Sequence, residues 1–318
     1  MNLYLESLAF AASVTLPIFC LVLLGWLFQR LRLIDDHFVA RASKLIFSAA
    51  LPTLIFINIV QLDIGAVVHA GQLAYALLST LVAFLLLWWG AWRWIATPED
   101  RGVFVQGALR GNLGIIGLAL CASLYGPPGL AMGSLLLAAI TLLYNVLSVF
   151  ILTLAVQQSP RIDWRRLLGD LARNPLIIAI LAALPLAALE WRLPAILLQT
   201  GRYFADLTLP LALLCVGATI HLKTLRDTSN LSLWATLIKL LALPGLQTLG
   251  AWWLGLDGLL LGTLFLMLAS PTATVSFVMT QAIGGNGRLA ANLVALSTLA
   301  SVLTLSLGLF LLRTLGWI

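Results

Sequence analysis

The chain has 318 residues, of which 61% are hydrophobic and only 9% are charged, and its mean hydropathy is +1.05. These values lie outside the range of soluble globular domains and indicate a polytopic membrane protein in a lipid bilayer. The net charge of +6 could suggest nucleic-acid binding, but the basic residues gather between apolar segments. We therefore interpret the charge as a topology signal and expect no nucleic-acid partner.

Ten apolar segments of roughly 20 or more residues are each long enough to cross a bilayer. They are predicted at residues 7–28, 38–60, 73–94, 102–124, 128–156, 171–191, 195–220, 231–253, 258–283 and 289–312. The cysteines Cys20, Cys121 and Cys215 lie inside these spans without metal or redox spacing. We expect them to be small buried side chains, and we predict no metal and no cofactor.

The basic residues predict the orientation of the spans. The connections after spans 1, 3, 5, 7 and 9, with the adjoining span ends, hold thirteen Lys and Arg residues, among them Arg41 and Lys44. The opposite side holds Arg192, Arg202 and Arg313. Because cytoplasmic loops carry the excess of Lys and Arg, both termini are expected on the extracytoplasmic side.

The longest connection, at residues 157–170, divides the chain into two sets of five spans. Residues 1–157 and 158–318 are therefore predicted as two repeats, and an odd number of spans in each gives them opposite orientations. A constant offset of 158 residues relates Pro17 to Pro175, Pro52 to Pro210 and Gly126 to Gly284.

The segment at residues 268–281, LASPTATVSFVMTQ, places a proline and several hydroxyl groups inside span 9. We expect a broken helix, with Ser270 as the N-cap of a new half-helix and Pro271 in its first turn. Thr272 and Thr274 add polar groups there, although such side chains commonly bond to carbonyls of their own helix. A half-helix at this depth directs unpaired N–H groups and a positive dipole end toward the middle of the membrane.

Under the same offset, Ser270 and Pro271 fall on Asn112 and Leu113 in span 4, inside GALRGNLGIIGLAL at residues 107–120. The glycines of this segment, Gly114 among them, weaken the helix, and Asn112 can cap a second half-helix. Breaks at matching positions of two inverted halves indicate a transporter binding site. The alternative is a pair of kinks that neighbouring helices repair.

Other polar residues inside spans complete the set of candidate binding residues. Arg110 and Lys239 are the ionisable groups placed furthest inside spans, where a charge is costly unless it is paired or reaches the interface. Tyr144, Asn145 and Gln281 are candidates for substrate contact or for bonds between helices. The central parts of the spans hold no Asp or Glu, and the chain shows no catalytic constellation, so an enzyme is not expected.

Seven motifs run through spans 2 and 4 to 9: LPTLIF, RGNLGIIG, LLYNVLSV, RNPLIIAI, LPLALLCVGATI, KLLALPGL and SPTATVSFVMTQAIGGNG. In this order and spacing they resemble the auxin efflux carrier family, in its bacterial branch. Ala119 is a departure, because many relatives have a proline soon after the glycine run. The resemblance implies an all-α fold of ten transmembrane helices as two inverted five-helix repeats, with broken helices 4 and 9 crossing at the centre. Bile acid sodium symporters share this architecture.

The resemblance also implies how the protein is used. Spans 1, 2, 6 and 7 would form a scaffold, and spans 3–5 and 8–10 a moving transport domain. We expect a secondary transporter of small organic anions in the bacterial inner membrane. A homodimer that forms through the scaffold domain is compatible with this arrangement. The family suggests auxin-like aromatic acids in plants and dicarboxylates such as malate or malonate in bacteria. The alternatives are a sodium- or proton-coupled carrier of another substrate, and a membrane sensor that binds an organic acid without transport.

Overall fold

The computed structural model describes residues 2–61, 69–157, 169, 173, 175–191, 193–220 and 229–318. Every named element within these residues is a helix, which confirms the predicted all-helical class for this part of the chain. Most of the predicted connection at residues 157–170 lies outside the described residues. The same holds for a group of basic residues used to predict orientation, namely Arg161, Arg165, Arg166, Arg192, Lys223 and Arg226.

The helices follow one another along the chain with short connections, and η marks a π-helical turn. The first half contains α1 (Asn2–Arg30), α2 (Asp36–Leu45), η1 (Ile46–Ala50), α3 (Leu51–Val60), α5 (Ala70–Trp94), α6 (Pro98–Leu109), η2 (Leu113–Gly117) and α7 (Leu118–Gln157). The second half contains α9 (Pro175–Ala188), α10 (Ala195–Asp206), α11 (Thr208–Ala218), α12 (Asn230–Leu237), η4 (Ile238–Ala242), α13 (Leu243–Trp253), α14 (Gly258–Leu268), α15 (Val275–Ile283) and α16 (Gly287–Thr314).

Within the described residues, six helical stretches are long and apolar enough to cross a membrane. They are Leu5–Arg30, Asp36–Val60, Ala70–Trp94, Leu113–Val156, Asn230–Trp253 and Gly287–Thr314. Large apolar side chains such as Leu23, Leu86 and Trp253 are exposed on these helices. Such exposure is favourable in contact with lipid but unfavourable in water. The chain is therefore a multi-pass membrane protein, and the count of ten spans stays a prediction.

The stretch Leu113–Val156 is bent at Gly126. Its 44 residues would measure about 66 Å as one straight helix, about twice the thickness of the hydrocarbon core. Gly126 has φ 61° and ψ −144° inside α7, a conformation that glycine adopts at little cost. The bend falls between predicted spans 4 and 5. The two predicted spans are therefore joined by a sharp bend at Gly126 and not by a loop.

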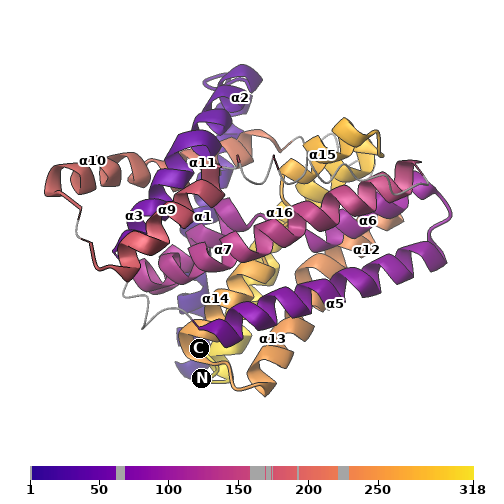
Figure 1. Cartoon of the computed structure of the whole chain (residues 1–318). Helices are drawn as coiled ribbons and strands as arrows, with labels where there is room; N and C mark the ends of the chain where they lie inside the picture. Colours follow the sequence, from indigo (N-terminus) through magenta and orange to yellow (C-terminus); the bar gives the residue numbers. More distant parts are fainter. Residues whose placement is uncertain are drawn as a thin grey trace.

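The predicted span at residues 195–220 is two helices rather than one. α10 ends at Asp206, and α11 begins at Thr208. Pro210 has no N–H to donate to the carbonyl of Asp206, and its ring crowds that carbonyl, which is the physical reason for the interruption. α10 lies at the edge of the molecule, where it packs against α3 (Figure 1).

Two other prolines follow π-helical turns. Pro52 comes after η1, and Pro244 comes after η4. In a regular helix each proline ring would clash with the carbonyl four residues earlier, and the wider turn relieves that clash. Such turns are frequent at functional sites.

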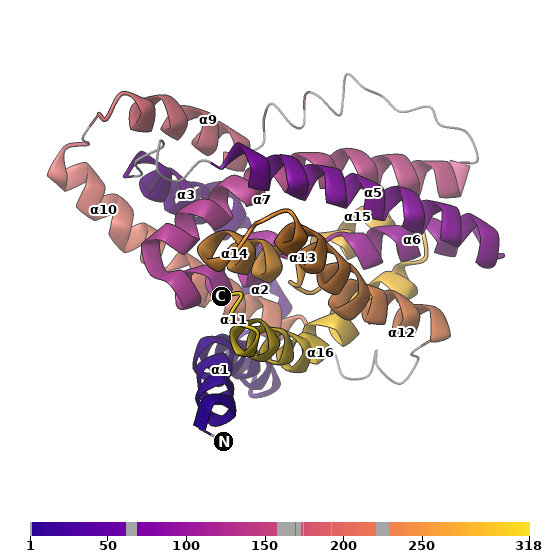
Figure 2. The same cartoon turned by 90° about the horizontal axis from the view of Figure 1, so that it is seen from below.

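The helices form two groups at opposite sides of the molecule. α3, α9 and α10 lie at one side, and α5, α6 and α12 lie at the other (Figures 1 and 2). α11 packs against α3 and α10 of the first group, and α16 packs against α6 and α12 of the second. α1 packs against both α11 and α16, and thus lies between the groups. Residues Gly102–Leu109 of α6 and Leu261–Leu268 of α14 are buried on every side, so the ends of these two helices lie in the centre of the fold.

Candidate functional site

Both predicted breaks are present. α6 ends at Leu109, Arg110 is extended with φ −78° and ψ 103°, and helical structure resumes at Leu113. Asn112 occupies the N-cap position, as predicted, but its side chain makes no capping bond. The glycine-rich sequence on either side explains why the helix gives way here.

The second break runs from the end of α14 at Leu268 to the start of α15 at Val275. The prediction that Ser270 caps the new half-helix is wrong, because the N-cap is Thr274 and the Ser270 hydroxyl donates to the Met267 carbonyl at 2.7 Å. Pro271 accordingly lies in the extended break and not in the first turn of α15. The unwound segment is longer than the sequence suggested, since it is held by bonds from outside its own helix.

The two breaks pair with each other as a short antiparallel bridge between Gly111 and Thr272. The N–H of Asn112 donates to the carbonyl of Pro271 at 2.7 Å, and the N–H of Ala273 donates to the carbonyl of Arg110 at 3.0 Å. These bonds satisfy backbone groups that no helix can satisfy, which is the condition for unwound backbone at membrane depth. We call this pair of breaks the crossing.

Side chains brace the crossing from both sides. The Thr272 hydroxyl donates to the Gly107 carbonyl at 2.8 Å, so this side chain bonds across the crossing and not to its own helix. The Thr272 N–H donates to the Ser297 hydroxyl of α16 at 3.0 Å. A Cβ atom at Gly111 would lie 2.6 Å from the Ser270 hydroxyl oxygen, so the close approach of the two chains requires glycine.

Lys239 lies on one face of the crossing. Its side chain is 2% exposed, and its ammonium donates to the Leu109 carbonyl at 3.3 Å and to the Leu268 carbonyl at 3.0 Å. These carbonyls end α6 and α14, where the helix dipoles place partial negative charge. Lys239 therefore neutralises the C-terminal ends of both broken helices at once.

The other face of the crossing borders a cavity of about 230 Å³, which we call the inner cavity. The N-terminal ends of η2 and α15 both open onto it, since Leu113, Gly114, Thr274 and Val275 line it. The crossing thus separates two electrostatic environments: negative helix ends meet Lys239, and positive helix ends meet the cavity.

Arg110 supplies the inner cavity with a full positive charge. Its side chain is 7% exposed, and its guanidinium donates to the Asn145 side-chain oxygen at 2.7 Å and to the Ser148 hydroxyl at 3.3 Å. Tyr144 completes this wall, with its hydroxyl bonded to the backbone of Gly111. Among the described residues that line the cavity none is a carboxylate, so neutral dipoles orient Arg110 without cancelling its charge.

Six of the predicted binding residues line the inner cavity. They are Arg110, Asn112, Gly114, Tyr144, Asn145 and Thr274. The other five do not line it: Lys239 lies on the opposite face, Ser270, Pro271 and Thr272 are buried within the crossing, and Gln281 is exposed near the end of α15.

Several residues of this site were not predicted. Ser148 lies three residues after Asn145 on α7, and helical spacing alone could have identified it as a partner of the same guanidinium. Ser297 carries no such signal, because it reaches Thr272 only through the tertiary fold. Phe47 of η1 and Leu176 of α9 also line the cavity, as apolar residues that nothing in the sequence distinguishes from core.

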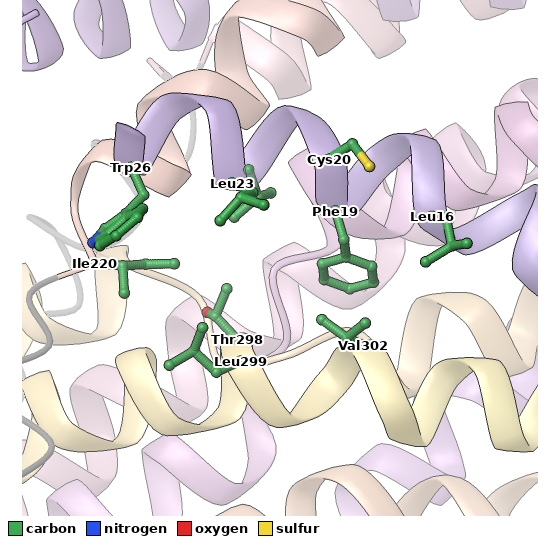
Figure 3. Close-up of a pocket in the computed structure, with 10 residues that line it drawn as sticks. Leu16, Phe19, Cys20, Leu23, Trp26, Ile220, Thr298, Leu299 and Val302 are labelled. Atoms are coloured by element: carbon green, nitrogen blue, oxygen red, sulfur yellow. The ribbon is translucent and has the colours of Figure 1, made fainter. Parts of the chain in front are cut away.

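A second hollow, of about 370 Å³, lies between α1 and α16 and has a different character (Figure 3). Phe19, Leu23 and Trp26 of α1 face Leu299 and Val302 of α16 across it. The hydroxyl of Thr298 donates to the Val294 carbonyl of its own helix, so this groove has few polar groups that could bind an ionic ligand. Cys20 also lines the groove and is exposed, which corrects the prediction that it is buried.

The model of the family described as "Membrane transport protein" matches residues 10–164 and 164–309. A protein of Rhizobium meliloti (strain 1021) named "Putative malonate transporter" is 25% identical over 317 residues, covering 95% of this chain and 96% of that protein. An "Uncharacterized transporter" of Methanothermobacter thermautotrophicus is 22% identical over 303 residues, which cover 93% of this chain and 97% of that protein.

The family match extends over nearly the whole chain and includes both breaks of the crossing. It agrees with the resemblance found in the sequence motifs and with the apolar helices of the fold. The chain therefore belongs to the auxin efflux carrier family of membrane transport proteins.

Proposed function

We propose that the protein is a secondary transporter of small organic anions that works by elevator-type alternating access. The observation that carries the proposal is the inner cavity, in which the buried Arg110 and the N-terminal ends of η2 and α15 all favour negative charge. A carboxylate placed there would meet a guanidinium and backbone N–H groups, and its hydrocarbon part would meet Leu113 and Leu137.

The size of the cavity favours a short substrate. Its volume of about 230 Å³ is below the range of about 300–1,000 Å³ typical of sites for drug-sized ligands. A dicarboxylate of a few carbon atoms suits this space better than an aromatic acid. The name of the Rhizobium relative supports malonate as the first substrate to test.

The helix boundaries support two inverted five-helix repeats at residues 1–157 and 158–318. With the offset of 158 residues, the end of α1 at Arg30 falls on Ala188, the end of α9, and the end of α3 at Val60 falls on Ala218, the end of α11. Gly126 falls on Gly284, and both have positive φ, 61° and 92°. The break after Leu109 falls within one residue of the break after Leu268.

The inner cavity lies between the proposed moving parts. Phe47 and Leu176 come from α1–α3 and α9–α11, the proposed scaffold. The remaining lining residues come from α5–α7 and α12–α16 and their breaks, the proposed transport domain. A site at such a boundary can be carried across the membrane when one group slides against the other.

Topology and assembly are part of the same proposal. Both termini lie at the bottom of the molecule in Figure 1, which suits an even number of spans. We place both outside the cytoplasm of a bacterial cell, with the protein in the inner membrane. The exposed apolar residues Ile196, Leu197 and Tyr203 on α10 offer the scaffold a surface for a homodimer.

The experiment is uptake of radiolabelled malonate by proteoliposomes that contain the purified protein. Arg110→Met removes the charge but keeps much of the apolar stem, and it is expected to lower uptake at least about tenfold, equivalent to about 1.4 kcal/mol of lost anion binding. The matched control is Arg93→Met, which removes an exposed arginine from the last turn of α5.

Three outcomes contradict the proposal in different ways. Equal uptake by wild type and Arg110→Met would remove the anion site. Malonate binding without flux would indicate a sensor, and sodium- or proton-driven uptake of another substrate, with no flux of malonate, would indicate a coupled carrier.

A further inference from the structure

A third hollow, which we call the outer cavity, has a volume of about 650 Å³ and lies between two groups of helices. α2, η1 and α11 form one wall, and α15 and α16 form the other. α2 and α15 lie at the end of the molecule opposite the two termini (Figure 1), which is the predicted cytoplasmic end.

The outer cavity carries a charge of the same sign as the inner one. Among the described residues that line it, the charged side chain is Lys44, in the last turn of α2. Ser43, Ser48 and Thr219 add hydroxyl groups to the walls, and the rest of the lining is mostly apolar. Lys44 thus favours an anion over a cation at its wall of the outer cavity.

The inner and outer cavities share part of their walls. Phe47, Thr274 and Val275 line both cavities. Phe47 lies in the π-helical turn η1 and is 39% exposed. Thr274 and Val275 stand at the start of α15, which belongs to the other proposed moving part, so the shared wall combines Phe47 of one part with a helix start of the other.

We propose that the outer cavity is a cytoplasmic antechamber for the same small carboxylate, in which Lys44 attracts the anion and Phe47 controls its passage to the inner cavity. This inference rests on the proposed function, because it assigns the approach path of that substrate. It adds a binding site and two residues that the crossing does not contain.

The test measures how fast thiol reagents reach the inner cavity, and it does not require transport. Thr141 lines the inner cavity, and Thr141→Cys is introduced after Cys20, Cys121 and Cys215 have been replaced. Everted membrane vesicles, which expose the cytoplasmic face, are treated with an anionic or a cationic methanethiosulfonate of similar size. Lys44→Gln is expected to slow the anionic reagent about three- to fivefold and not to slow the cationic one. The expected effect is modest because one unit charge is lost and water partly screens its field.

The matched control for Lys44 is Arg41→Gln. Arg41 lies on the same helix one turn earlier and is also exposed, but it does not line the outer cavity. It is expected to leave the ratio of anionic to cationic labelling rates near that of the parent. High salt should reduce the Lys44 effect, because exposed charges are screened. Equal effects of the two substitutions would overturn the assignment of Lys44.

The role of Phe47 is tested with two reporter positions. Phe47→Trp is expected to slow labelling at position 141 severalfold, and Phe47→Ala to accelerate it. Neither should change labelling of a thiol introduced by Thr219→Cys, which lies in the outer cavity before the partition. If Phe47 substitutions alter both positions equally, or neither, Phe47 does not divide the two cavities.

Failure of this inference and failure of the proposed function give different results. Malonate should protect the thiol at position 141 from labelling if the inner cavity binds it. Absence of protection would count against malonate as the substrate, whereas protection without any Lys44 or Phe47 effect would leave the inner site intact and remove the antechamber.

Discussion

The backbone N–H of Asn112 donates a hydrogen bond of 2.7 Å to the carbonyl oxygen of Pro271, although the two residues lie in different halves of the sequence. With the reciprocal bond from Ala273 to Arg110, it joins two broken helices into one unit. The electrostatics of the site depend on this unit, because it directs the positive helix ends to one face and the negative ends to the other.

Gly111→Ala is expected to separate the two chains of the crossing. The added Cβ would lie 2.6 Å from the Ser270 hydroxyl oxygen and 3.0 Å from the Lys239 ammonium, both of which are buried. We expect a loss of about 1–3 kcal/mol in stability, seen as a lower melting temperature in detergent, together with weaker uptake. Gly71→Ala is the control, since a Cβ there meets nothing within 4 Å. Equal melting temperatures for the two variants would contradict the close approach.

Lys239→Ala is expected to destabilise the protein by about 2–5 kcal/mol, because it leaves a cavity and removes the donor from two buried carbonyl groups. Lys44→Ala removes an exposed lysine and should change stability by less than about 0.5 kcal/mol. Thermal unfolding in detergent compares the two. A melting temperature for Lys239→Ala that matches the parent would show that the helix ends do not need this ammonium.

Uptake is expected to persist when sodium is replaced by choline. The carbonyls of Leu109 and Leu268 are oxygen ligands of the kind that a metal cation prefers, but they already accept bonds from Lys239. A bound sodium ion would have to displace that ammonium. Initial rates in sodium and choline buffers at equal ionic strength test this, and a rate that falls to background in choline would contradict it.

Asn145→Asp is expected to abolish anion uptake while leaving the protein folded. The new carboxylate would pair with Arg110 at the position of the present 2.7 Å bond and cancel the charge that faces the inner cavity. Ser148→Ala should have a smaller effect, because it removes a bond of 3.3 Å and adds no charge. Ser134→Ala serves as control, since that hydroxyl bonds to the Leu130 carbonyl of its own helix. Undiminished malonate uptake by Asn145→Asp would exclude Arg110 as the anion ligand.

Local sequence predicted the position of both breaks, because glycine, proline and capping residues act on their own stretch of helix. It placed Ser270 as a cap incorrectly, since the length of the unwound segment depends on bonds to Arg110, Gly107 and Ser297 from elsewhere in the fold. Lys239 shows the same limit. Its depth in span 8 was visible in the sequence, but the carbonyls it meets end two other helices.

The predicted spans were similarly informative only where helices are regular. The long apolar helices such as α5 and α16 follow the predicted ranges within a few residues. The span at residues 195–220 was predicted as one segment because its apolar composition is continuous across Leu207. The effect of Pro210 on the geometry of the preceding turn does not alter hydropathy, so composition could not reveal the division.

The bond from Thr272 to Ser297 fastens the unwound strand to α16, the longest of the described helices in the second half. The unwound segment has lost its own helical hydrogen bonds, and this bond to a continuous helix helps to hold it in place. The backbone bonds of the crossing likewise join residues of the proposed transport domain alone. In the proposed elevator mechanism, a rigid-body shift of the transport domain would therefore leave the bond between Thr272 and Ser297 intact.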